Sequence, residues 1–266
     1  MKSRFALLCL VTLIAWAAPA AAVHPNRQHG GIDSPLYGEV LSGVDYAYID
    51  VLTGEPIGAT HILFSVGTFA HYDASREYAI EDATADLYTI DTSTAATTRI
   101  ANTGLSGIVS GLRWDAGTDK TYATLHAPDC SGSTLYTIDL SSAATTTVGS
   151  VSGCIVALAI APSGLMYGVD SSSGALVAID KTNGSVESIG ALGFSVDESI
   201  EIDVEPISGI LYGFQDTVGG GGTSFFSIDV TTGFAMLITT IPVPAITALA
   251  FATRLDPIFD DGFDGN

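Results

Sequence analysis

One fifteen-residue phrase stands twice in this chain of 266 residues, and it constrains the fold more than any other feature. The phrase "LYTIDTSTAATTRIA" begins at Leu87, and "LYTIDLSSAATTTVG" begins at Leu135. Weaker copies begin at Ala47, Leu176 and Phe225. Self-similarity at a period of about 20–50 residues indicates a repeat architecture, in which each unit buries its apolar faces against its neighbours.

Two markers recur in every unit, a tyrosine and, further on, an aspartate that follows an isoleucine. The tyrosines are spaced 41 to 45 residues apart, at Tyr37, Tyr78, Tyr122, Tyr167 and Tyr212. The aspartates follow them by 13 or 17 residues, at Asp50, Asp91, Asp139, Asp180 and Asp229. Because both markers keep step through the chain, they indicate five copies of one structural unit.

Each unit has the composition of four β-strands. Short runs rich in Val, Ile, Tyr, Phe and Thr alternate with Gly, Asn, Asp and Ser turn residues. An apolar strand precedes each tyrosine strand, and the Ile-Asp strand and a Thr- or Val-rich return strand follow. The apolar strands are "ILFSV" from Ile62, "SGLRW" from Ser110, "VALAI" from Val156, "IEIDV" from Ile200 and "ALAF" from Ala248. This pattern predicts an all-β, five-bladed β-propeller of four-stranded antiparallel blades.

The two ends of the repeat region complete one unit between them. The chain enters the pattern at a tyrosine strand and leaves it with a spare apolar strand. We therefore expect Ala245–Ala252 to pair with Leu36–Leu41, since an open ring would leave sheet edges exposed. The expected boundaries are a signal peptide at 1–22, an N-terminal arm at 23–34, the propeller at 35–253 and an acidic tail at 254–266.

The first segment has the features of a secretory signal peptide. Lys2 and Arg4 precede a short apolar run, and "APAAA" offers small residues for cleavage. We expect a secreted, periplasmic or cell-surface protein, in a compartment where cysteines oxidise. Cys130 lies before an Ile-Asp strand and Cys154 before an apolar strand, and both connections leave from the same face of a propeller. The two cysteines are therefore predicted to form a disulfide.

The net charge of the chain limits the classes of partner that it can bind. The formal net charge is −20 at pH 7. Such a surface repels phosphate backbones and anionic lipid headgroups, which argues against nucleic-acid partners and membrane insertion. We expect a monomer that binds an unidentified protein or carbohydrate ligand.

The repeated aspartates are expected to stabilise turns rather than to catalyse a reaction. Each is followed by a turn sequence such as "DKTNG" or "DVTTG", in which the carboxylate accepts bonds from backbone N–H groups two or three residues on. The sequence contains no G-x-S-x-G or Ser-x-x-Lys nucleophile motif and no His/Cys metal-ligand spacing. No catalytic residue and no transition-metal site are therefore predicted.

One apolar strand departs from the pattern. In "SIEIDVEP", Glu201, Asp203 and Glu205 alternate with apolar residues. Alignment of the apolar strands sets Asp203 level with Arg113, near the channel, and puts Glu205 at the strand end, where it would serve the turn. We predict a ligand or cation site at the channel mouth from Glu201, Asp203, Glu205 and Arg113, with Ca²⁺ as the ion that carboxylates favour. Simple solvation of these carboxylates is the other interpretation, and Arg113 would reach Asp203 only across a narrow channel.

These observations favour a secreted, non-catalytic interaction or scaffold protein without a cofactor, and Ca²⁺ at the channel mouth is the candidate ion. The alternative is an extracellular hydrolase or lyase that uses the acidic residues at the channel. Glycoside hydrolysis needs two carboxylates about 5–9.5 Å apart. In five-bladed hydrolases these acids come from different blades, whereas Glu201 and Asp203 share one strand.

The phrase "LYTID" and the segments "LMYG" and "ILYG" carry a family resemblance. Over residues 36–252 the chain resembles a broad group of secreted bacterial propellers and is loosely similar to quinoprotein amine dehydrogenase β-chain-like repeats. The resemblance implies the fold, and it implies neither an activity nor a quinone cofactor. The ending "DPIFDDGFDGN" is similar to the short acidic tails of exported Gram-negative bacterial proteins, which implies a sorting or processing signal.

Overall fold

The computed structural model describes residues 36–40, 45–49, 56–61, 66–73, 76–91, 94–217, 222–241 and 246–251. These residues form twenty β-strands and their turns, with no helix among them. The predicted signal peptide, the N-terminal arm, the acidic tail and Asp50 lie outside the described residues.

Four blades each take four strands that are consecutive in the chain. The first contains β4 (Val66–Asp73), β5 (Arg76–Glu81), β6 (Asp86–Asp91) and β7 (Thr97–Asn102). The second contains β8 (Ile108–Asp115), β9 (Lys120–His126), β10 (Ser133–Ile138) and β11 (Thr145–Val151). The third contains β12 (Ile155–Ile160), β13 (Met166–Asp170), β14 (Ala175–Ile179) and β15 (Val186–Ala191). The fourth contains β16 (Glu201–Val204), β17 (Leu211–Asp216), β18 (Thr223–Ile228) and β19 (Ala235–Ile241).

The first three strands and the last strand that the structure describes form a further four-stranded sheet. Its strands are β20 (Ile246–Phe251), β1 (Leu36–Val40), β2 (Asp45–Ile49) and β3 (Pro56–His61), in that order. β20 runs antiparallel to β1, with Leu36 opposite Phe251 and Val40 opposite Ile246. The pairing that the repeat pattern predicts between these two strands is therefore present.

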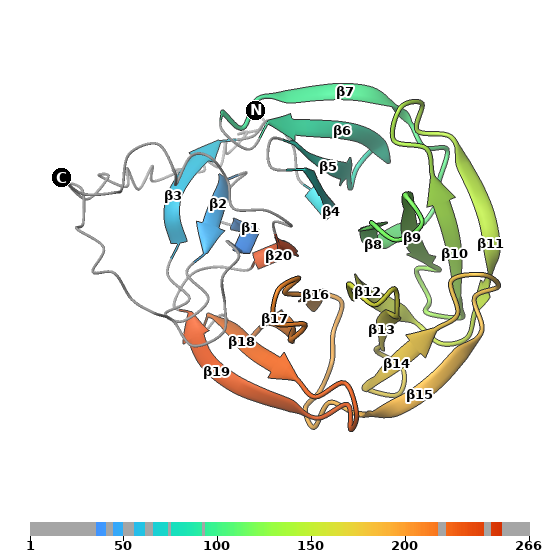
Figure 1. The fold of residues 1–266 in the computed structure, drawn as a ribbon, viewed down its shortest axis with the longest axis vertical. Helices are drawn as coiled ribbons and strands as arrows, with labels where there is room; N and C mark the ends of the chain where they lie inside the picture. The colour runs from blue at the N-terminus through green and yellow to red at the C-terminus, as the bar shows by residue number, and fades with distance from the viewer. Residues whose placement is uncertain are drawn as a thin grey trace, which may run out of the picture.

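The sheets stand in a ring around a central axis (Figure 1). β4, β8, β12, β16 and β20 are the innermost strands, and β7, β11, β15 and β19 lie at the rim. This arrangement confirms the all-β propeller class with four-stranded antiparallel blades.

One inner strand differs from its predicted position. The run "ILFSV" from Ile62 was expected as the apolar strand of the first blade, whereas the observed inner strand is β4, which begins at Val66. β4 ends two residues before β5, and Asp73 is opposite Arg76 in the hairpin. The position of the inner strand is thus determined by the tight hairpin to the tyrosine strand. It is not determined by where the most apolar run lies in the sequence.

The repeated tyrosines join each blade to the next. The described ones, Tyr78, Tyr122, Tyr167 and Tyr212, are all at most 7% exposed. Tyr78 belongs to a cluster with Leu112 and Ile138 of the following blade, and Tyr167 to one with Ile202. Burial of a tyrosine ring contributes on the order of 2 kcal/mol. The marker that reveals the repeat is therefore also a contact that holds neighbouring blades together.

Two glycines allow the blades to approach closely at the rim. A Cβ atom on Gly149 would stand 2.0 Å from the carbonyl oxygen of Asn183, and one on Gly190 would stand 2.0 Å from that of Thr232. In both cases the glycine lies on the rim strand of one blade, and the carbonyl lies in the last turn of the next. Any larger residue would push the two blades apart.

Candidate functional site

Arg113 of β8 reaches across the inner end of the blades to β16. Its Nη2 donates a hydrogen bond of 2.7 Å to the carbonyl oxygen of Ile202 and lies 3.3 Å from Oε2 of Glu201. Its Nε lies 3.4 Å from Oδ1 of Asp203. Since the blade of β12 stands between those of β8 and β16, the channel is narrow enough for a side chain to bridge two non-adjacent blades.

Asp203 extends this network to β20. Its Oδ2 accepts a 2.7 Å hydrogen bond from the backbone N–H of Phe251, and its Oδ1 accepts one of 2.9 Å from the N–H of Val204. Phe251 also packs against Tyr212, with ring centroids 5.6 Å apart. Arg113 and Asp203 thus tie together three inner strands, one of which is the strand that pairs with β1.

The two acidic groups beside Arg113 differ in electrostatic environment. The side chain of Glu201 is 5% exposed, and burial raises its pKa from 4.5 to about 8, while Arg113 opposes this rise. Glu201 is therefore mostly protonated at neutral pH, because an uncompensated buried carboxylate is costly. The Arg113 guanidinium, 4% exposed, then pairs with the Asp203 carboxylate.

A cavity of about 220 Å³ opens beside this network. Arg113 and Asp203 line it together with apolar groups from Trp114, Pro206 and Phe251, whereas Glu201 does not line it. The volume is below the roughly 300–1,000 Å³ of most small-molecule sites. Both oxygens of Asp203 already accept backbone hydrogen bonds, and the neighbouring guanidinium repels a cation. The arrangement disfavours calcium and leaves room for a small polar ligand.

Glu205, the fourth residue of the predicted site, is directed to the turn after β16. Its carboxylate accepts hydrogen bonds from the backbone N–H groups of Ile207 and Ser208. Asp115, at the same position in the second blade, accepts a bond from Gly117 N–H and also pairs with Lys181 of the next blade. The structure thus brings Glu201, Asp203 and Arg113 together and leaves Glu205 out.

The described repeat aspartates accept backbone hydrogen bonds in the turns that follow them. The donors are the N–H of Thr94 for Asp91, of Ser141 and Ser142 for Asp139, of Thr182 for Asp180 and of Thr231 for Asp229, at 2.8 to 3.1 Å. Bonds from the neighbouring Ser and Thr hydroxyls and backbone lower the pKa of Asp139, Asp180 and Asp229. These carboxylates are engaged in turns at the rim, far from the channel.

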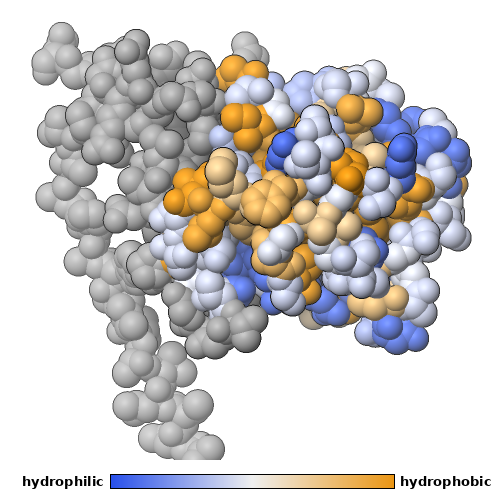
Figure 2. Space-filling view, turned by 90° about the horizontal axis from the view of Figure 1, so that it is seen from below, coloured by the Kyte–Doolittle hydropathy of each residue, from blue (hydrophilic) through white to orange (hydrophobic). Residues whose placement is uncertain are grey.

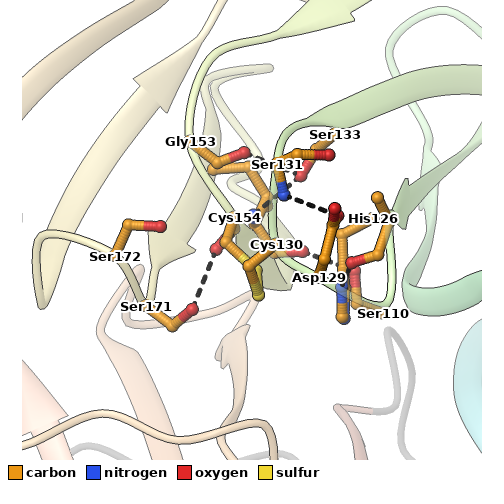
Figure 3. Close-up of a disulfide and its surroundings, with 12 residues drawn as sticks. Ser110, His126, Asp129, Cys130, Ser131, Ser133, Gly153, Cys154, Ser171 and Ser172 are labelled. Atoms are coloured by element: carbon orange, nitrogen blue, oxygen red, sulfur yellow. Dashed lines mark hydrogen bonds between the residues drawn. A yellow bond between two sulfur atoms is a disulfide. The ribbon is translucent and has the colours of Figure 1, made fainter.

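The predicted disulfide between Cys130 and Cys154 is confirmed. Cys130 lies between β9 and β10, and Cys154 lies directly before β12, so the bond links the second blade to the third (Figure 3). In the chain-entropy treatment, closing a loop of this length stabilises the fold by about 3 kcal/mol.

The sequence interpretation missed an apolar surface on the fourth blade. Phe234, Met236, Leu237 and Ile238 are 59%, 65%, 61% and 41% exposed. A cavity of about 370 Å³ beside them is lined by Leu237, Phe194 and Phe226, among others. Figure 2 views the molecule from the side on which β19 lies in Figure 1, and apolar side chains gather on this face. The signal was available, because the other blades with consecutive strands carry small or polar residues at the positions of Phe234, Met236 and Leu237, whereas the position of Ile238 is apolar in all of them.

Comparisons with known proteins support the fold alone. No protein-family model and no curated protein matches the chain, so the particular repeat family and the tail family suggested by the sequence find no support. A chain from a nidogen/laminin complex is similar in structure, with a TM-score of 0.54 and 10% identity, over 82% of this chain and 98% of that one.

Two longer bacterial proteins are also similar. One is a Bacteroides thetaiotaomicron protein of unknown function, with a TM-score of 0.50 and 15% identity, over 77% of this chain and 49% of that one. The other is hydrazine synthase of Kuenenia stuttgartiensis, with a TM-score of 0.45 and 16% identity, over 68% of this chain and 51% of that one. The chain thus spans about half of each. Within its described part, this chain contains no helix able to cross a membrane.

Proposed function

We propose that this chain is an exported, non-catalytic, five-bladed propeller that binds an extended polypeptide segment along the outer edge of β19. The observation that carries the proposal is the run of exposed apolar side chains on this edge strand. The disulfide is consistent with an extracellular location. One structural neighbour comes from a protein–protein complex, which agrees with a binding role for the fold.

β19 is suited to strand addition because it is the last strand of its sheet. Among the described residues no further strand pairs with it, although Ala235 N–H donates to the carbonyl oxygen of Leu192. An exposed apolar edge strand is a template for pairing with another chain, and proteins usually protect such edges with polar or charged residues. β7, β11 and β15 have that protection, for example Arg99 and Glu187 at the position of Leu237 and Met236.

The cavity beside β19 provides a pocket for an apolar side chain of the partner. Leu237 lies at its border, and Phe194 packs edge-on against Phe226 with ring centroids 5.0 Å apart. In strand addition, main-chain hydrogen bonds supply affinity, and pockets for alternate side chains supply specificity. A strand whose apolar residues alternate would place one of them in this pocket.

Charge complementarity favours a neutral or basic partner over a second copy of this chain. Two copies that each carry a formal charge of −20 repel one another. A basic segment would be attracted over long distances, and its binding would weaken as salt concentration rises.

A direct test uses a fluorescent ten-residue peptide that alternates valine with lysine. We expect it to bind the wild-type protein, and Leu237→Asp to weaken binding at least tenfold. Ser188→Asp adds the same charge at the same position of β15, an exposed residue, and should leave binding unchanged. A block peptide of five lysines followed by five valines controls for charge alone.

Three results would overturn this proposal. The first is equal binding of the two peptides, and the second is equal binding by the Leu237→Asp and Ser188→Asp variants. The third is a wild-type protein that sediments as a dimer and becomes monomeric on Leu237→Asp, because the β19 edge would then serve self-association.

The second candidate function is a hydrolase or lyase that uses Glu201 and Asp203. The raised pKa of Glu201 favours it, since a carboxylic acid that stays protonated at neutral pH can act as a general acid. Glu201 does not line the neighbouring cavity, and this position argues against a catalytic role. The wild-type protein would first be screened for turnover of polysaccharides. If Asp203→Asn then abolished an activity found in that screen without changing the melting temperature, the enzyme would be favoured.

A further inference from the structure

We propose that reduction of the Cys130–Cys154 disulfide creates a zinc site whose third ligand is His126. The disulfide and the zinc ion are then alternative ways of linking the second and third blades. His126 and Cys130 lie four residues apart in the second blade, whereas Cys154 comes from the start of the third blade, so the complete set of ligands is brought together only by the fold.

The contacts of His126 indicate the tautomer that a metal ligand bonded through Nε2 needs. It is the last residue of β9 and is 1% exposed. Its Nδ1 lies 3.0 Å from the carbonyl oxygen of Ala127. Because a carbonyl only accepts hydrogen bonds, Nδ1 carries the proton, and Nε2 retains a lone pair. A backbone carbonyl fixes the tautomer of many zinc-bound histidines in the same way.

The Nε2 atom of His126 is buried and has no hydrogen-bond partner among the described residues. A buried acceptor without a partner loses the hydrogen bond that it would make with water in the unfolded chain, so such an atom is unusual in a folded protein. Figure 3 shows His126 beside the disulfide. A bound zinc ion would satisfy this lone pair.

The three side chains are close enough to share one ion. The two sulfur atoms and one His126 nitrogen all lie within 4.8 Å of one another. With Zn–S bonds of about 2.3 Å and tetrahedral angles, the sulfurs of a zinc site are roughly 3.8 Å apart. The Cα atoms of the two cysteines are 4.9 Å apart, so rotation of the side chains after reduction supplies this separation.

The chemistry balances with a dithiol as the reductant. Two electrons and two protons pass from the dithiol to the disulfide, which becomes two thiols, while the dithiol becomes a cyclic disulfide. Zinc then displaces the two thiol protons and accepts the lone pair of Nε2. Two thiolates neutralise the charge of the ion, which permits burial, and water can fill the fourth position. Thiolate and imidazole ligands select zinc over calcium or magnesium.

The test compares zinc binding by the oxidised and the reduced full-length protein. The protein is reduced anaerobically with dithiothreitol, the reductant is removed, and Zn²⁺ is titrated in competition with a chromogenic chelator. We expect one ion per reduced chain and none per oxidised chain. Co²⁺ in place of Zn²⁺ should give the visible absorption bands of a tetrahedral site with thiolate ligands.

His126→Gln should weaken zinc binding by the reduced protein at least tenfold, because it removes one of three ligands. Asp129→Asn is the matched control, because it removes a nearby charge that is not one of the three ligands. The Asp129 carboxylate accepts a hydrogen bond from the backbone N–H of Ser131. A reduced chain that unfolds and regains its circular dichroism with zinc supports the proposal, and one that stays unfolded with zinc contradicts it. Equal zinc affinity of the His126→Gln variant and the wild type would also overturn it.

Discussion

Replacement of Glu201 by glutamine should change how the stability of the protein depends on pH. The pKa of Glu201 is 4.5 in the unfolded chain and about 8 in the folded one. Between these values the folded protein holds a proton that the unfolded chain has lost, so the wild-type stability falls as pH rises. The loss begins at pH 4.5 and is complete above pH 8. Converted to free energy, this pKa difference corresponds to at most about 5 kcal/mol.

Glutamine has no carboxyl group to titrate, so the Glu201→Gln variant does not lose stability in this way as pH rises. The free energy of unfolding of Glu201→Gln, minus that of the wild type, should increase by a few kcal/mol between pH 4.5 and pH 8. Urea unfolding at half-unit pH intervals measures the difference. Because both proteins share the repulsion among the other acidic groups, the subtraction isolates Glu201.

Glu198→Gln serves as the control, since Glu198 is exposed on the segment that leads into β16. This variant measures what the loss of one exposed carboxylate alone does to the free energy of unfolding. If Glu201 were instead an ionised partner of Arg113, the wild type would gain stability relative to Glu201→Gln as pH rises. A decreasing or constant difference for Glu201→Gln would therefore refute the reasoning.

Two further variants test contacts between blades. Gly190→Ala should lower the free energy of unfolding by about 1–3 kcal/mol in a calorimetric measurement, because the added Cβ would collide with the Thr232 carbonyl. Gly132→Ala is the control and should have little effect, because a Cβ at Gly132 would meet open space. Lys181→Met should cost about 1–3 kcal/mol at neutral pH by leaving the buried carboxylate of Asp115 without its cation. Burial raises the pKa of Asp115, but hydrogen bonds from Lys181 and from the turn outweigh burial and hold this pKa below 3.8. The cost of Lys181→Met should therefore disappear as pH falls below 3.8 and Asp115 becomes protonated. A cost that does not depend on pH would count against the ion pair.

The repeat pattern predicted the ring because its signals are local. Turn residues and alternating apolar residues specify hairpins, and Tyr78, Tyr122, Tyr167 and Tyr212 are buried in the structure. The position of the inner strand β4 could not be read from hydrophobicity alone, because the hairpin to β5 determines where that strand lies. Local signals thus describe blades better than they describe strand boundaries.

The candidate site was only partly predictable because it depends on the width of the channel. The alignment set Arg113 level with Asp203, but only the packing of all the blades determines whether a guanidinium can cross the axis. The same limit explains why His126 was missed, since only the packing of the third blade against the second brings Cys154 close to His126 and Cys130. By contrast, the apolar residues of β19 were visible in the sequence and needed only the knowledge that this strand lies at the rim.

The closure of the ring is tested most directly by two truncations. Deletion of residues 245–266 removes β20, which pairs with β1 and donates from Phe251 N–H to Asp203, whereas deletion of 256–266 leaves β20 intact. Loss of the buried Phe251 ring alone costs about 3–5 kcal/mol, so the longer deletion should lower the melting temperature by at least about 10 °C. The shorter deletion should leave it unchanged. Equal melting temperatures for the two truncated proteins would contradict a ring closed by β20.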